Sequence, residues 1–282
     1  MSDKTTVPVA QPAGGAPPPS RVSDGVGGGG RRLGSLASRF SMLGVLVVLI
    51  IVATFLYPAF LNPANIGNIL TQNSAIGLIA IGMTFVIICG GFDLSVGATY
   101  ALGATLYAGL TLQTGSVLVA GLLTLAAGIV VGVVNGLIIS RLNINPFVAT
   151  LGTASIISGV AYVYSNSSPF IVNNVPQFQD LALSTIAGIP QPIWILVIAF
   201  VLAAILLSKT TFGRNVYAVG GTSLLGDEGA IWRSAVGLLI LATLTNVFYS
   251  LNVSQNWQLI AKGTIVVAAV GVDAIIRVRK RG

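Results

Sequence analysis

Long apolar runs separated by short polar segments are the main pattern along this chain. From residue 42 onward, eight such runs each hold roughly 20 residues, which is long enough for an α-helix to cross a bilayer. A transmembrane barrel would instead show short segments of alternating polarity. We therefore predict an all-α, polytopic transmembrane helical bundle. The predicted spans are 42–61, 70–90, 94–112, 116–140, 146–165, 192–208, 234–252 and 257–276.

The composition agrees with a membrane protein and excludes several kinds of chemistry. Hydrophobic residues make up 54% of the chain and charged residues 7%, whereas a soluble domain holds about 25% charged residues. The chain has no histidine and one cysteine, Cys89. These counts exclude histidine-based catalysis, a Cys/His metal cluster and an intrachain disulfide. We expect no metal, no cofactor and no enzyme activity.

The first 40 residues differ from the rest of the chain. They are rich in proline, glycine and small residues, and such a composition cannot bury a core. We predict a disordered cytoplasmic N-terminal tail over 1–40 and a transmembrane domain over 41–282. The glycine run in the tail is not a phosphate loop, since the pattern GxxxxGK[ST] occurs nowhere in the chain.

The basic residues predict the orientation of the spans. With the N-terminus placed in the cytoplasm, 13 of the 14 lysines and arginines fall in segments at the inner side, as the positive-inside rule requires. The remaining one, Lys262, lies within the last span. This partition predicts an even number of crossings with both termini cytoplasmic, and it accounts for the basic charge without nucleic acid. The longest outer loop, 166–191, is either a docking surface or a plain connector.

A break in the pattern occurs at "ICGGFDLSVG", residues 88–97. An ionised carboxylate at the centre of a bilayer costs about 2.5–3.5 kcal/mol on insertion scales, so Asp93 needs a reason to lie here. Gly90 and Gly91 allow the backbone to turn just before it. Asp93 then either caps the third span through the amide of Ser95 or Val96, or belongs to a break that lines a polar path. The two interpretations are compatible.

The fourth span carries glycines every four residues, at Gly128, Gly132 and Gly136. They share one helix face, and small residues let two helices approach closely in lipid. We predict that this stripe packs against another helix. The amide of the adjacent Asn135 needs a partner, either on another helix or in water along a pathway.

The break has a second copy further along the chain. "GGFDLSVGA" at 90–98 is similar to "GGTSLLGDEGA" at 220–230, and both lead into an apolar span. Internal repeats are common in transporters. The candidate residues of this second copy are Gly220, Gly221, Ser223 and Gly226.

Several longer stretches resemble one family. The stretches are "NSAIGLIAIGMTFVIICGGFDLSVGATYALGA" (73–104), "NGLIISRLNINPFVATLGT" (135–153), "TFGRNVYAVGG" (211–221) and "QLIAKGTIVVAAVGVD" (258–273). In these the chain resembles the permease subunits of bacterial sugar-type ABC importers, the ribose/xylose/galactose branch of the branched-chain amino acid permease superfamily. The resemblance covers most of 65–282.

The resemblance implies a permease subunit of an ATP-driven importer for a ribose-like monosaccharide in the bacterial inner membrane. It implies work by alternating access, a cytoplasmic ABC ATPase, a periplasmic or lipoprotein sugar-binding protein and a homodimeric permease. The absence of a phosphate loop agrees with an ATPase supplied by another chain. The resemblance also implies that the motif lies at the translocation path, and we extend this expectation to Asn135. The candidate path residues are Gly90, Gly91, Asp93, Ser95, Gly97 and Asn135.

The chain departs from the family at one point. In relatives a cytoplasmic coupling segment and about two spans separate the two motifs that here share Gly220 and Gly221. The family usually has ten spans, whereas eight are predicted here, so we expect an internal deletion that removes the ATPase-contacting segment and leaves coupling in doubt. The alternatives are an ATP-independent secondary transporter or channel, and a non-functional truncated membrane paralogue.

Overall fold

The computed structural model describes residues 28–220 and 231–265 of the chain. The chain divides into two units, 1–40 and 41–282. In the first unit the described residues, 28–40, are helical. The second unit contains the rest of α1 and all the other helices and strands.

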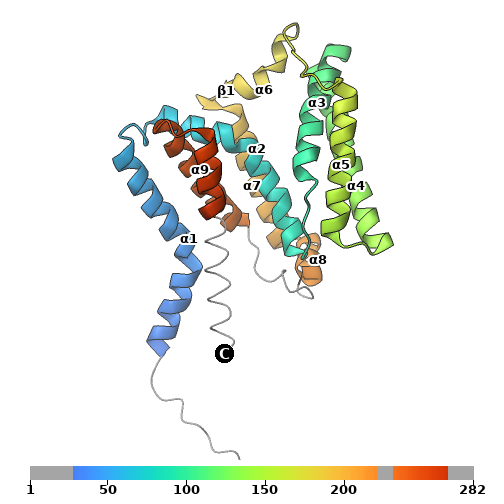
Figure 1. Ribbon diagram of the computed structural model, residues 1–282. Helices are drawn as coiled ribbons and strands as arrows, with labels where there is room; N and C mark the ends of the chain where they lie inside the picture. Colours follow the sequence, from blue (N-terminus) through green and yellow to red (C-terminus); the bar gives the residue numbers. More distant parts are fainter. Residues whose placement is uncertain (1–27, 221–230, 266–282) are drawn as a thin grey trace, which may run out of the picture. The chain divides into compact units, whose positions relative to one another are not determined.

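The described residues are almost entirely helical (Figure 1). A short hairpin pairs Thr185 with Pro190 and Ile186 with Ile189 in antiparallel register. The prediction of an all-α fold is therefore confirmed. The elements in chain order are α1 (Gly28–Leu56), α2 (Pro63–Ile88), α3 (Val96–Thr114), α4 (Val117–Leu142), α5 (Pro146–Ser165), η1 (Pro176–Phe178), α6 (Asp180–Leu183), β1 (Thr185–Ile186), β2 (Ile189–Pro190), α7 (Gln191–Lys209), α8 (Thr211–Gly220) and α9 (Ile231–Ser250). Residues 255–265 are also helical.

Five of the eight predicted spans are helices long and apolar enough to cross a membrane, namely α2, α4, α5, α7 and α9. The apolar part of α1, Met42–Leu56, is shorter. Helix α3 has 19 residues but is more polar, since it carries several threonines, two tyrosines and a glutamine. The last predicted span is described only to residue 265. A polytopic membrane protein is confirmed, while the count of eight spans and the cytoplasmic termini stay predictions.

Helix α1 begins earlier than the first predicted span. It starts at Gly28, inside the segment 1–40 that composition predicts to be a disordered tail. Residues 28–32 are three glycines and two arginines. Because none of them is a large apolar residue, the spacing of apolar residues does not indicate where the helix begins. Residues 1–27 lie outside the described part, so the predicted tail stays a prediction there.

Local signals in the sequence begin several helices. The side chain of Asn62 accepts a hydrogen bond from the Ala64 amide, and that of Asn145 accepts one from the Phe147 amide. A proline follows each asparagine as the first helical residue, where its missing N–H costs nothing. Such side-chain acceptors satisfy amides that have no partner inside the helix.

The helices of this unit form two packed groups. Helix α2 contacts α7, α8 and α9, and α3 contacts α4 and α5. The α2–α9 contact includes polar pairs, since Thr84 and Ser234 share a hydrogen bond of 2.6 Å and the Asn65 and Asn246 amides bond reciprocally at 2.9 and 3.2 Å. In lipid, where no hydrophobic force draws helices together, such bonds contribute to helix association.

The turn between α7 and α8 depends on Gly213. A Cβ atom at this position would lie 2.0 Å from the carbonyl oxygen of Leu207, which belongs to α7. The Gly213 amide also donates to the Thr210 hydroxyl at 3.1 Å. Helix α8 then lies against α2, where Phe85 and Phe212 form a tilted ring pair at 6.2 Å. Only glycine permits this close approach without a backbone shift.

We predict that Gly213→Ala displaces α8 from α7. The clash is with backbone atoms, so we expect a loss of about 1–3 kcal/mol and a lower apparent melting temperature for the purified chain in detergent. The Cys89 thiol lies 3.9 Å from the Val216 carbonyl oxygen of α8, so its reaction with a thiol reagent should also accelerate. Gly82→Ala is the control, since a Cβ there meets nothing within 4 Å. Equal melting and thiol reactivity in both variants would contradict this role of Gly213.

Candidate functional site

The break at residues 89–95 begins with a helix terminus that depends on Gly90. Helix α2 ends at Ile88, and Gly90 has a φ of 79°, a conformation that favours glycine. The Gly90 amide donates to the Ile87 carbonyl at 2.9 Å and the Gly91 amide to the Val86 carbonyl at 3.0 Å. These two bonds form a Schellman motif, which satisfies carbonyls at the end of a helix. Gly91 itself has no positive φ, and a Cβ there would make ordinary contacts.

The carboxylate of Asp93 organises the start of the next helix. Its Oδ1 accepts hydrogen bonds from the Ser95 amide at 2.8 Å and from the Ser95 hydroxyl at 2.6 Å. The prediction that Asp93 accepts from the amide of Ser95 is confirmed. The negative charge also lies close to the N-terminus of α3, where the helix dipole favours it. No ion pair to Asp93 is found among the described residues.

Two further helices hold this turn in place. The Asn135 side chain of α4 donates from Nδ2 to the Ser95 hydroxyl oxygen at 2.8 Å. The Leu94 amide donates to the Thr150 hydroxyl of α5 at 3.0 Å, and that hydroxyl donates to the Pro146 carbonyl at 2.8 Å. We call Asp93, Ser95, Asn135 and Thr150 the polar clamp. It joins the turn to α4 on one side and to α5 on the other.

Burial makes the polar clamp energetically important. Ser95 and Thr150 are 1% exposed and Asn135 is 6% exposed, whereas Asp93 is half-buried. A buried polar group that loses its partner costs about 1–3 kcal/mol. The partner that the buried Asn135 amide requires is the hydroxyl of Ser95, at the start of α3. Asn135 also lines a mostly apolar cavity of about 280 Å³, which is formed largely by α4 and α5.

The length of α2 places the clamp relative to the membrane. Its 26 residues extend about 39 Å at 1.5 Å per residue, which exceeds a hydrocarbon core of about 30 Å. The turn thus follows a complete crossing. This favours a position near the membrane boundary, where a charged side chain costs less than at the centre.

The structure brings some of the predicted site residues together and leaves others apart. Gly90, Gly91, Asp93 and Ser95 belong to one turn, and Asn135 binds it. Gly97, the second residue of α3, is exposed, and a Cβ there meets nothing within 4 Å. Of the second copy, Gly220 is buried at the end of α8. The other three, Gly221, Ser223 and Gly226, lie outside the described residues.

The glycine stripe of α4 has an open environment. A Cβ at Gly128, Gly132 or Gly136 would meet nothing within 4 Å among the described residues. Helix α4 instead packs on α3 through another face, which includes Ala120 and Asn135. Only 6% of its most apolar stretch is buried. The predicted packing of the stripe thus has no partner among the described helices.

Thr150 is the clamp residue that the sequence did not reveal. It lies in the first turn after "NINP", which is a recognisable helix start. Its hydroxyl binds a backbone amide 56 residues earlier in the chain. Nothing in the spacing of residues connects those two positions, so only the packing of α5 against the turn identifies it.

Comparison with known proteins shows clear relatives. Residues 65–227 match the family described as "Branched-chain amino acid transport system / permease component". The chain is 34% identical to the ribose import permease protein RbsC of Bacillus subtilis, over 81% of this chain and 90% of that protein. It is 28% identical to the L-arabinose transport system permease protein AraH of Escherichia coli, over 88% and 94%. No solved structure matches the chain significantly.

These alignments are longer than the part of this chain that they cover. The comparison with the B. subtilis protein runs over 290 positions, but the 81% of this chain that it covers amounts to only about 228 residues. About 60 positions of the alignment thus have no counterpart here. The comparison with the E. coli arabinose permease, over 309 positions and 88% of this chain, gives a similar number. The family match ends at residue 227, close to the expected junction at Gly220 and Gly221.

We predict that the bond between Asn135 and Ser95 contributes measurably to stability. Asn135→Ala and Ser95→Ala should each lower the apparent melting temperature, and the double variant should lose less than the sum, with a coupling of about 0.5–2 kcal/mol. Asn73→Ala is the control, because the Asn73 amide binds the Ile69 carbonyl of its own helix. Strict additivity of the Asn135 and Ser95 effects would show that this bond is energetically silent.

Proposed function

The chain belongs to the branched-chain amino acid transport system permease component family, and on that premise we propose that it forms the membrane-spanning subunit of an ATP-driven monosaccharide importer. The observation that carries the proposal is the family match over 65–227, which includes the whole polar clamp. The named relatives import ribose and arabinose, which supports a pentose-like substrate. The protein itself carries out no covalent chemistry, and ATP is hydrolysed by a separate partner.

The polar clamp gives this function a physical element. It fixes the start of α3 against α4 and α5, so these three helices can move as one body. In alternating access, nucleotide binding to a partner shifts the equilibrium between outward- and inward-facing states. We propose that the turn from Gly90 to Gly97 lies at the inner mouth of the translocation path. Gly97 is one of the exposed positions on this turn, with Phe92 and Leu94, and Asp93 is the charged one.

We further propose that the chain works as a homodimer in the inner membrane, with a cytoplasmic ABC ATPase and a secreted sugar-binding protein. The open stripe of Gly128, Gly132 and Gly136 supports a second copy as the missing partner of α4. Glycines spaced by four residues allow the close backbone approach on which helix association in lipid depends. Both termini lie in the cytoplasm in this proposal, in agreement with the distribution of basic residues.

The alignment positions without a counterpart in this chain bear on coupling, and we propose that they fall after Gly220. Because the chain lacks about 60 alignment positions present in the B. subtilis relative, we propose that it has lost much of the surface that contacts the ATPase. It then couples weakly to ATP hydrolysis, or not at all, while keeping the clamp and the path. An ion-driven transporter or a channel remains the alternative that a transport assay distinguishes.

We predict that ATP-driven uptake into proteoliposomes, reconstituted with the partners that co-purify with the chain, is slow or absent for this chain. The assay uses radiolabelled D-ribose and L-arabinose, with ATP or a non-hydrolysable analogue inside. A matched chain with the corresponding segment of the B. subtilis relative inserted after Gly220 should take up sugar faster, because that segment restores the proposed coupling surface.

Equal, ATP-dependent uptake by both chains would refute the loss of coupling but support the importer. Uptake that persists without ATP and follows an ion gradient would refute the importer. A chain that inserts correctly but supports no uptake in either form would identify a non-transporting paralogue.

A further inference from the structure

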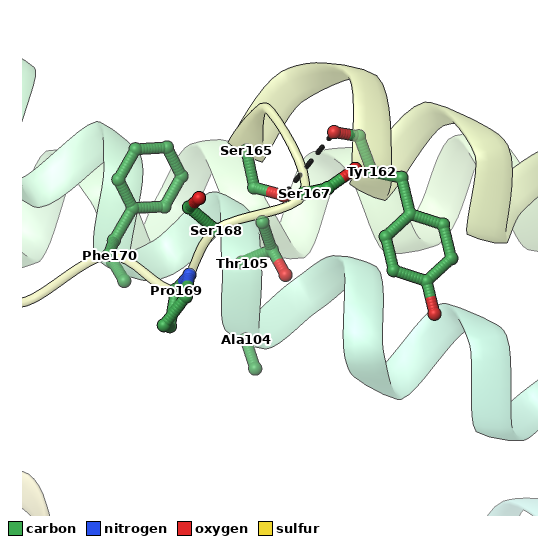
Figure 2. A pocket seen from close by; sticks show the side chains of 9 residues that line it. Ala104, Thr105, Tyr162, Ser165, Ser167, Ser168, Pro169 and Phe170 are labelled. Carbon is green, nitrogen blue, oxygen red and sulfur yellow. Dashed lines mark hydrogen bonds between the residues drawn. The ribbon is translucent and has the colours of Figure 1, made fainter.

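A recess with many hydroxyl groups lies between α3 and the segment that follows α5 (Figure 2). Its volume is about 330 Å³. Ala104 and Ala108, four residues apart on α3, leave room on the helix side because their side chains are small. Ser167, Ser168 and Pro169 form the opposite side. The recess is distinct from the polar clamp, since none of its lining residues belongs to the clamp.

An unusual backbone turn shapes this recess. Asn166 and Ser167 both have positive φ, at 49° and 56°, in the left-handed region that few residues other than glycine adopt. The Ser167 amide donates to the Tyr162 carbonyl at 2.9 Å, which ends α5. The chain reverses here and brings Ser168 into the lining. Strained backbone of this kind costs about 1–3 kcal/mol per residue and clusters at binding sites.

The segment after the turn is anchored on α3. Phe170 and Tyr164 form a tilted ring pair with centroids 5.5 Å apart. Both rings lie over Gly109, where a Cβ would come within 2.5 Å of the Tyr164 hydroxyl oxygen and 2.9 Å of a Phe170 ring carbon. The Tyr164 hydroxyl also accepts from the Gln113 side chain at 3.3 Å. The absence of a side chain at Gly109 therefore lets Phe170, which lines the recess, lie close to α3.

The lining presents hydroxyl groups and no carboxylate, ammonium or guanidinium group. The Thr105 hydroxyl donates to the Ala101 carbonyl at 2.8 Å and keeps its lone pairs as acceptors. The Ser167 and Ser168 hydroxyls have no hydrogen-bond partner among the described residues. Tyr162, 64% exposed, adds an aromatic ring. Neutral donors and acceptors beside apolar carbon match a neutral, polyhydroxylated molecule better than an ion.

We propose that this recess is an entry site at which the permease binds a free monosaccharide before translocation. The inference rests on the proposed function for its substrate class and on the predicted external position of the loop that starts at residue 166. A volume of about 330 Å³ is at the small end of the range of about 300–1,000 Å³ for ligand pockets. It suits one sugar ring rather than an oligosaccharide. A glycolipid headgroup has the same chemistry and is the competing source.

The test is saturation-transfer difference NMR on the full chain in phosphatidylcholine nanodiscs, with D-ribose and L-arabinose as probes. We expect a signal from at least one of the two sugars. Ala104→Leu should largely abolish it, because the larger side chain fills the recess. The double variant Ser167→Ala/Ser168→Ala should weaken binding about three- to tenfold, as expected for lost hydrogen bonds.

Matched controls are Ala126→Leu and Ser155→Ala, which alter the same residue types at exposed helix positions outside the recess. Both should bind like the unmodified chain. Sugar binding that survives Ala104→Leu would overturn the entry site and leave the importer intact, as would absence of any sugar signal from a chain that transports. A second disc preparation contains added monogalactosyl diacylglycerol; a signal from this glycolipid and from neither sugar would assign the recess to a lipid headgroup and refute the proposal. Loss of sugar uptake itself, measured in proteoliposomes, bears on the proposed function alone.

Discussion

The hydrogen bonds of Ser95 and of the adjacent Leu94 join the start of α3 to α4 and α5. The Ser95 hydroxyl donates to Asp93, accepts from Asn135 and lies one residue from the amide that binds Thr150. Inside an apolar helical bundle a polar group without a hydrogen-bond partner costs free energy, and the bonds of these four residues satisfy polar groups at the start of α3. The start of α3, and with it the turn after α2, has its position because these bonds are made. The function proposed for the turn depends on that same arrangement.

Much of the fold could be predicted from the sequence because lipid imposes strong constraints. The length of apolar runs identified α2, α4, α5, α7 and α9, and the pair Gly90–Asp93 marked the break between α2 and α3. Helix α3 met the length but not the apolar composition, since it carries four threonines and two tyrosines. The helical start at Gly28 was missed because glycine and arginine obscure periodicity.

The candidate site was predicted less completely, for a physical reason. Asp93, Ser95 and Asn135 are polar residues in apolar surroundings, so they attract attention in a sequence. Thr150 does not, because threonine commonly bonds to its own helix backbone and its second role arises only from packing. The two glycines before Asp93 also differ: Gly90 needs its positive φ, whereas Gly91 does not. The glycine stripe of α4 was interpreted as packing, and it is open among the described helices.

We propose that the turn from Gly90 to Gly97 borders an aqueous path at the inner side. The most direct test of this proposal places a single cysteine at position 97, in a Cys89→Ala background, and measures labelling by a charged, membrane-impermeant thiosulfonate. We expect fast labelling in inside-out vesicles and none in intact cells. Leu202→Cys, on an exposed apolar face of α7, should stay unlabelled in both. If Gly97→Cys is equally unreactive from both sides, the turn faces lipid or protein, and the proposal that it borders an aqueous path is wrong.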